Sequence, residues 1–115
     1  NQDPRLVKRG LEHAKKAGLI VQAYFILGLP GETWQTFKQT LGYLQTLPLT
    51  EEDKIDFFIA TPYPGSDLWE KQKELGLRII EENWDLYNTE HVIFETRDLK
   101  KEDIEQMREE AREAF

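Results

Sequence analysis

The feature that most constrains how this chain can fold is a nearly continuous apolar run from Leu19 to Leu27, which Gly28-Leu29-Pro30-Gly31 ends. A strand with one wet face alternates apolar and polar residues, whereas continuous apolar character is typical of a strand buried on both faces. Strands of this kind belong to parallel sheets and normally have neighbours on each side. The run therefore predicts a central parallel strand.

Helical patterns surround this strand and a second one within the first 76 residues. Asp3 and Pro4 form a helix start, as N-cap and first helical residue, and Gly18 stands where a C′ glycine ends a helix. Apolar spacing predicts a helix over 33–47, a strand over 55–60 and a short helix over 67–75. The span between the strands exceeds the roughly dozen residues that a parallel crossover needs. We therefore expect an α/β fold with a parallel sheet.

Beyond Gly76 the pattern weakens until the last helix. Residues 83–87 indicate a loop with aromatic anchors, and residues 91–94 indicate a short extended piece. Residues 100–115 predict an amphipathic helix whose apolar face carries Ile104, Met107, Ala111 and Phe115. Its charged residues, with Arg108 beside Glu105, are expected to face water, as are the loop charges around Asp53. We divide the chain into βα units (1–76) and a C-terminal extension with a closing helix (77–115).

Composition excludes several classes of protein. A net charge of −7 argues against a nucleic-acid partner, because phosphate binding requires a basic patch. Without cysteine the chain alone offers no disulfide, thiolate nucleophile or cysteine-ligated cluster. The sequence shows no apolar run near the ~20 residues of a membrane span and opens with no secretory pattern. We therefore expect a cytoplasmic location.

Two strands do not complete a sheet that protects its faces and edges. Either the chain pairs edge to edge with a second copy, or the rest of the sheet lies outside it. The chain starts at Asn1 rather than at a methionine, and this favours the second explanation, with the native protein extending further upstream.

The loop from Gly28 to Thr33 is the first candidate site. Glycines let backbone approach a ligand closely, and the loop follows a parallel strand, where α/β folds bind ligands. Glu32 argues against a phosphate, because its charge would repel an anion at the helix N-terminus. An acceptor of this kind suits an amine, a hydroxyl or a backbone N–H. The alternative is a tight turn in which Glu32 favours the helix dipole.

The second candidate is the loop Thr61-Pro62-Tyr63-Pro64-Gly65-Ser66 after the next strand. Its prolines fix a rigid path that can present backbone groups to a flat ring, and Tyr63 adds a stacking surface. The alternative is a stiff turn in which Ser66 or Asp67 caps the following helix. Both loops are expected on the same rim of the sheet. We find no catalytic triad and no set of metal ligands in the sequence, since His13 and His91 lie far apart.

Residues 17–33 resemble the fifth strand of radical S-adenosylmethionine enzymes, most closely the branch with an N-terminal cobalamin-binding domain. The loop Thr61–Ser66 is similar to the Pro-x-Pro-Gly-Thr sequence at that family's sixth strand, with Ser66 in place of the usual threonine. Asn83-Trp84-Asp85-Leu86-Tyr87 and the closing helix are similar to the branch's C-terminal tail. The resemblance covers nearly the whole chain.

The resemblance implies the C-terminal part of an incomplete (β/α) barrel, completed by a missing N-terminal barrel half and acting on a small-molecule substrate. It places Ile26, Gly28 and Glu32, and from the sixth strand Thr61, Pro62 and Tyr63, near the adenine of S-adenosylmethionine. The parent would carry a 4Fe–4S cluster and could use cobalamin for methyl transfer. Because the family's Cys-x₃-Cys-x₂-Cys loop is absent here, we expect the isolated chain to hold no iron and to be inactive.

Two other functions stay open at this stage. The chain could be a non-catalytic α/β interaction module that self-associates through an exposed strand edge, which predicts a tight dimer in solution. It could also be half of a phosphate-binding barrel, which predicts phosphate affinity at the Gly28–Glu32 loop, although the charge of Glu32 opposes this.

Overall fold

The computed structural model describes residues 3–115, beginning with a helix, a strand, a helix and a second strand in that order. Helix α1 (Pro4–Lys16) starts at Asp3, whose carboxylate accepts a hydrogen bond from the Arg5 N–H at 2.9 Å. It ends before Gly18, which has a φ of 80°. Strand β1 (Gln22–Leu27), helix α2 (Trp34–Leu44) and strand β2 (Lys54–Ile59) follow. The predicted elements of this part of the chain are confirmed, with ends that differ from the predicted ones by a few residues.

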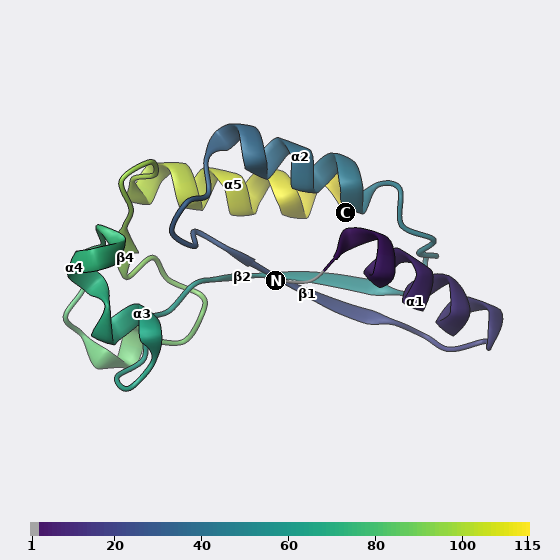
Figure 1. The fold of residues 1–115 in the computed structure, drawn as a ribbon, viewed down its shortest axis with the longest axis horizontal. Coiled ribbons are helices and arrows are strands. Elements are labelled where there is room, and N and C mark those ends of the chain that lie inside the picture. Colours follow the sequence, from purple (N-terminus) through teal and green to yellow (C-terminus); the bar gives the residue numbers. More distant parts are fainter. Residues whose placement is uncertain (1–2) are drawn as a thin grey trace.

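Strands β1 and β2 form a parallel pair, as predicted. Their register runs from Gln22 opposite Lys54 to Leu27 opposite Ile59. Pairing continues one residue past the end of β2, because the Ala60 N–H donates to the carbonyl of Leu27, the last residue of β1, at 2.8 Å. The two strands therefore end level with one another, and the loops that follow them start side by side (Figure 1).

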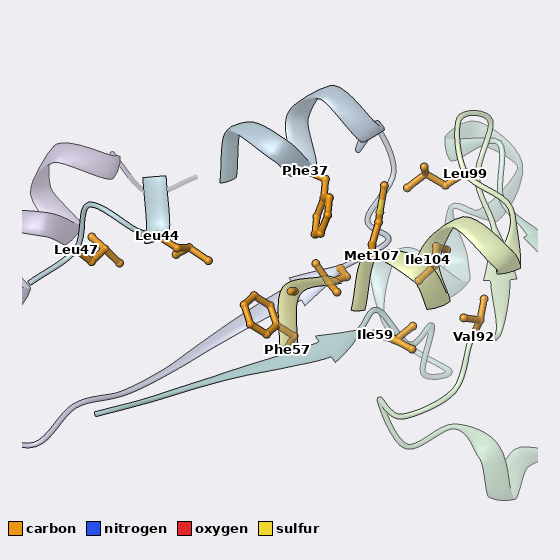
Figure 2. Packing of buried hydrophobic residues seen from close by; sticks show 11 residues of the cluster. Phe37, Leu44, Leu47, Phe57, Ile59, Val92, Leu99, Ile104 and Met107 are labelled. Carbon is orange, nitrogen blue, oxygen red and sulfur yellow. The ribbon is translucent and has the colours of Figure 1, made fainter. Parts of the chain in front are cut away.

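Helices α2 and α5 (Lys101–Ala114) cover one face of this sheet (Figure 1). The core forms where apolar side chains of these helices meet the covered face of the strands, since burial removes their apolar surface from water. Figure 2 shows part of this cluster, whose most deeply buried members include Leu27, Phe37, Leu44, Ile104 and Met107. The apolar face predicted for residues 100–115 is thus confirmed, although Phe115 is 46% exposed.

The opposite face of the sheet is open, and this corrects the expectation that β1 is buried on both faces. Ala23, Phe25 and Leu27 point toward the helices, whereas Tyr24 is 59% exposed and Ile26 is 54% exposed. Side chains alternate between the faces of a strand, and within residues 3–115 no helix lies over this second face of β1 (Figure 1). The apolar sequence of β1 thus exceeds what the described part of the chain can bury.

The segment after β2 folds into short elements beyond the ends of the strands (Figure 1). The single helix predicted over 67–75 is two helices, α3 (Asp67–Glu70) and α4 (Gln72–Leu75), because Lys71 leaves helical geometry with a φ of −104° and a ψ of 25°. The 3₁₀ helix η1 (Trp84–Leu86) occupies the expected aromatic loop. Strand β4 (Phe94–Glu95) begins at the last residue of the extended piece predicted over 91–94, and it pairs antiparallel with β3 (Arg78–Ile79). Strand β3 was not predicted, because two residues show no periodicity.

Asp53 is an interior anchor rather than the solvated loop charge that the sequence suggested. Its side chain is fully covered and accepts hydrogen bonds from the Val21 N–H at 2.7 Å, the Thr50 N–H at 2.8 Å and the Lys15 ammonium at 2.9 Å. These bonds, the one from Lys15 foremost, hold the pKa of Asp53 far below its usual range. The carboxylate therefore ties the end of α1 and the entry to β1 to the loop before β2.

Arg108 of α5 also departs from expectation. It is buried, and its guanidinium pairs with the Glu90 carboxylate rather than with Glu105. Among residues 3–115, no helix is both long enough and apolar enough to cross a bilayer.

Candidate functional site

The two loops singled out in the sequence lie together at one end of the sheet. Gly28–Thr33 follows β1 and Thr61–Ser66 follows β2, and the in-register parallel pairing brings both to the carboxyl edge of the strands. This edge is where open α/β sheets bind their ligands. The prediction that both loops share one rim is confirmed.

The first loop is closed by its own carboxylate. Glu32 Oε1 accepts a hydrogen bond from the Gly28 N–H at 2.7 Å, and the Glu32 N–H donates to the Leu29 carbonyl at 3.1 Å. Burial raises the pKa of Glu32, and the hydrogen bond from Gly28 partly opposes this rise. Of the three partners expected for Glu32, an amine, a hydroxyl or a backbone N–H, the structure thus shows a backbone N–H.

Position 28 requires glycine for two reasons, its backbone conformation and the nearby side chain of Ile104. Its φ of 85° lies in the left-handed region, and a Cβ placed on it would stand 3.2 Å from Cδ1 of Ile104. The close approach that this glycine permits is therefore to α5, on the covered side of the sheet. The first loop is seated on the closing helix.

The second loop is held by hydrogen bonds to the segments around it. Thr61 is buried, and its Oγ1 donates to the Ile59 carbonyl at 3.2 Å and accepts from the Thr89 N–H at 3.1 Å. Pro62 is fully buried, whereas Tyr63 is 44% exposed. Ser66 caps α3, accepting from the Trp69 N–H at 3.3 Å. The capping role foreseen for Ser66 is thus confirmed.

An apolar hollow of about 520 Å³ opens between the loops on the uncovered face of the sheet. Three predicted site residues, Ile26, Thr61 and Tyr63, line it, whereas Gly28, Glu32 and Pro62 do not. None of the lining side chains is charged at neutral pH. The full lining is Tyr24, Ile26, Leu29, Phe58, Ile59, Ala60, Thr61, Tyr63, Leu68 and Thr89.

Sequence reasoning missed several residues of this hollow. Tyr24 and Phe58 form an aromatic pair with ring centroids 5.4 Å apart, on the same face as Ile26. Alternation along each strand could have placed them there, because Tyr24 stands two residues before Ile26 and Phe58 two residues before Ala60, which line the same hollow. Thr89 carried no signal, since it reaches the hollow from a segment 28 residues beyond Thr61.

This arrangement can bind a flat, apolar group, but it holds no chemical machinery of its own. Aromatic and aliphatic side chains supply surface area, and Tyr63 adds a hydroxyl at the rim. Among the residues that the structure describes, no cluster of three or more His, Asp or Glu side chains could hold a metal ion. The lining of the hollow is therefore suited to binding a flat, apolar group.

Comparison with known proteins adds a biochemical context, although no family model matches the chain. It is 33% identical over 89% of its length to an uncharacterized methyltransferase of Pyrococcus horikoshii. It is 28% identical over 77% of its length to the bacteriochlorophyllide d C-12(1)-methyltransferase of Chlorobaculum tepidum. It is 31% identical over 70% of its length to the anaerobic magnesium-protoporphyrin IX monomethyl ester cyclase of Rubrivivax gelatinosus.

The chain spans only a small part of each of these proteins: 21% of the Pyrococcus protein, 18% of the Chlorobaculum enzyme and 14% of the cyclase. These relatives are two methyltransferases and a cyclase. Each is several times longer than this chain.

Proposed function

We propose that this chain is part of a radical S-adenosylmethionine enzyme of the methyltransferase type, and that its two strand-end loops form part of the adenine-side wall of the S-adenosylmethionine site. One observation carries the proposal: two parallel strands end level, and their loops flank an apolar hollow on the uncovered sheet face. The methyltransferase relatives support it, because S-adenosylmethionine is the common donor of methyl groups.

The predicted residues divide into two roles in this proposal. Ile26 and Tyr63 line the hollow and would contact the adenine, a flat ring suited to an apolar strip and an aromatic edge. Gly28, Glu32 and Pro62 do not line it and would shape the loops from behind. Thr61 joins both groups, because it lines the hollow while its hydroxyl is bonded to Ile59 and Thr89.

The other cofactors of such an enzyme do not fit this chain. A 4Fe–4S cluster, which supplies the electron that cleaves the sulfonium, needs cysteine thiolates, and the chain contains none. Its ligands would come from the rest of the parent, as would any cobalamin-binding domain.

The uncovered face also suits the missing part of the sheet. Within residues 3–115, β1 pairs only with β2, and its exposed side chains Tyr24 and Ile26 are apolar. In the proposed (β/α) barrel, residues 1–76 would be the last βα units, and 77–115 the extension that closes them. The preceding strands would pair with the free edge of β1, and the uncovered face would line the barrel interior.

The same face points to an apolar small molecule as substrate. Phe58 and Tyr24 extend the hollow away from the loops, and its volume of about 520 Å³ lies within the usual range of ligand pockets. Two relatives are named for acting on bacteriochlorophyllide and magnesium-protoporphyrin, which are large flat molecules. A substrate of this shape would lie against the Tyr24–Phe58 pair.

The test is S-adenosylmethionine binding to the anaerobically purified full-length parent, measured by equilibrium dialysis. We expect Tyr63→Ala to weaken binding by about fivefold to tenfold, because an aromatic contact contributes roughly 1 kcal/mol beyond its area. Tyr63→Phe should bind like wild type, since the ring supplies the contact. Leu6→Ala, at an exposed position on α1 outside the hollow, is the matched control. Absence of binding to the wild-type protein would refute the proposal.

Self-association through the strand edge is the second candidate, and the free edge of β1 within the described residues favours it. It predicts that residues 1–115 form a dimer in sedimentation experiments. It further predicts that a proline in place of Tyr24, on that strand, dissociates the dimer. A monomeric chain would exclude it.

A further inference from the structure

Thr89 forms a third side of the candidate site, and its backbone is bonded to the end of β2 and to the loop that follows. The Ile59 N–H donates to the Thr89 carbonyl at 2.8 Å, and the Thr89 N–H donates to Oγ1 of Thr61 at 3.1 Å. Both polar groups of the Thr89 backbone are thus bonded to the strand end and to the loop that follows it. Thr89 also lines the apolar hollow.

Thr89 stands in a conformation that needs external support. Its φ is 66°, the only positive φ of a non-glycine residue in the part of the chain that the structure describes. The left-handed region is unfavourable for a β-branched residue and persists only where its surroundings hold it. Asn88 supplies part of that support, since its side-chain oxygen accepts from the Glu90 N–H at 3.1 Å.

The stronger support comes from the closing helix. Arg108 donates through Nη1 to the Glu90 carbonyl at 2.8 Å, and its other guanidinium nitrogen pairs with the Glu90 carboxylate. Arg112, one turn further along α5, lies 3.6 Å from the same carboxylate. Arg108 is buried beside Ile104 and Met107, which are anchored in the core. Glu90 is therefore fixed to a rigid element through both its main chain and its side chain.

We propose that Glu90 and Arg108 are positioning residues for the ligand site, acting through Thr89 on Thr61 and the wall of the hollow. This rests on the proposed function for the identity of the ligand, while the connection itself rests only on the contacts above. When the Glu90 anchor is lost, Thr89 leaves its left-handed conformation, and the Thr61 loop loses the bonds that hold it against the hollow. The sequence gives no hint of this, because Glu90 and Arg108 are 18 residues apart.

The first measurement needs no ligand. Hydrogen exchange of the full-length parent reports the amides of Ile59 and Thr89, which both donate hydrogen bonds in this connection. Glu90→Gln keeps the shape of the side chain and removes its charge, and Arg108→Met removes both donors. We expect exchange at these amides to rise about tenfold in either variant, as for the loss of one charge-assisted hydrogen bond. Arg112→Met is the matched control, because its side chain is 58% exposed and exposed ion pairs contribute little.

The second measurement separates positioning from general stability. S-adenosylmethionine affinity should fall about tenfold in Glu90→Gln and stay at the wild-type value in the control Arg112→Met. In a Thr61→Val background, which lacks the acceptor for the Thr89 N–H, Glu90→Gln should add little further loss. Additive losses would show a merely structural role and overturn the proposal, as would unchanged exchange at Ile59 and Thr89. If exchange rises while the wild-type protein binds no S-adenosylmethionine, the connection stands and the proposed function fails.

Discussion

Replacement of Gly28 by alanine tests whether α5 is docked on the first loop as the structure has it. The added methyl group destabilises the folded chain in two ways. It disfavours the backbone φ of 85°, and it lies only 3.2 Å from Cδ1 of Ile104. The left-handed conformation costs about 1–2 kcal/mol and overpacking about 1–3 kcal/mol, while the lower entropy of unfolded alanine returns roughly 0.4–1 kcal/mol. We expect Gly28→Ala to lower the free energy of unfolding by about 2–4 kcal/mol.

Two other glycines separate these costs. Gly31 has a φ of 92° with no atom within 4 Å of an added Cβ, so Gly31→Ala carries the conformational cost alone. Gly42 lies inside α2, also with open space around it, so Gly42→Ala should stabilise the helix by roughly 0.5–1 kcal/mol. From the most to the least stable, the predicted order is therefore Gly42→Ala, wild type, Gly31→Ala and Gly28→Ala.

The assay is urea denaturation of the 115-residue chain followed by tryptophan fluorescence, with the slope of the transition checked for each variant. Ile104→Val should cost about 0.5–1.5 kcal/mol in the wild-type background but little beside Gly28→Ala, because it shortens the side chain that the new methyl meets. Equal losses in Gly28→Ala and Gly31→Ala, with no coupling to Ile104, would show that α5 does not pack against this loop.

Three further predictions concern individual side chains. Because the pKa of Asp53 is lowered in the folded chain, this carboxylate stabilises the fold above its unfolded pKa of about 3.9. The stabilisation is lost as the pH falls below that value. Asp53→Asn should therefore flatten the acidic part of a plot of urea midpoint against pH. The raised pKa of Glu32 has the opposite sign, so its ionisation destabilises the fold above about pH 4.3, and Glu32→Gln should raise the urea midpoint at pH 7 but not at pH 3. Trp34→Phe removes the indole hydrogen bond to Asp103, 3.0 Å long, which joins α2 to α5, and should cost about 1–3 kcal/mol because the acceptor is charged; an additive result with Asp103→Ala would contradict this.

The regular elements could be predicted because their signals are local. The Asp3 cap, the apolar spacing of α2 and the proline-containing loop after β2 all act within a few residues of the structure they determine. The rim shared by the two loops followed from the parallel order alone, since carboxyl ends of parallel strands meet at one edge. Ile26, Thr61 and Tyr63 were named as site residues by the family resemblance, and these three line the hollow.

The errors occurred where a residue is governed by contacts distant in sequence. Asp53 and Arg108 were expected in water because isolated charges are usually exposed. Asp53 is instead covered by donors from α1 and from the start of β1, and Arg108 by the carbonyl and carboxylate of Glu90. Neither partner stands at a helical spacing, and so no periodic pattern could reveal the pairs.

By itself, the sequence determined the order of the longer helices and strands, the parallel crossover and the two stiff loops, because backbone preferences and side-chain periodicity act over short distances. Only the tertiary structure decided which face of the sheet stays open, and that Thr89 reaches the hollow with Glu90 anchored on α5. The physical reason is that these outcomes depend on how α5 packs after the chain has turned back on the sheet. That packing is a balance of burial and hydrogen bonding between segments that no local pattern connects.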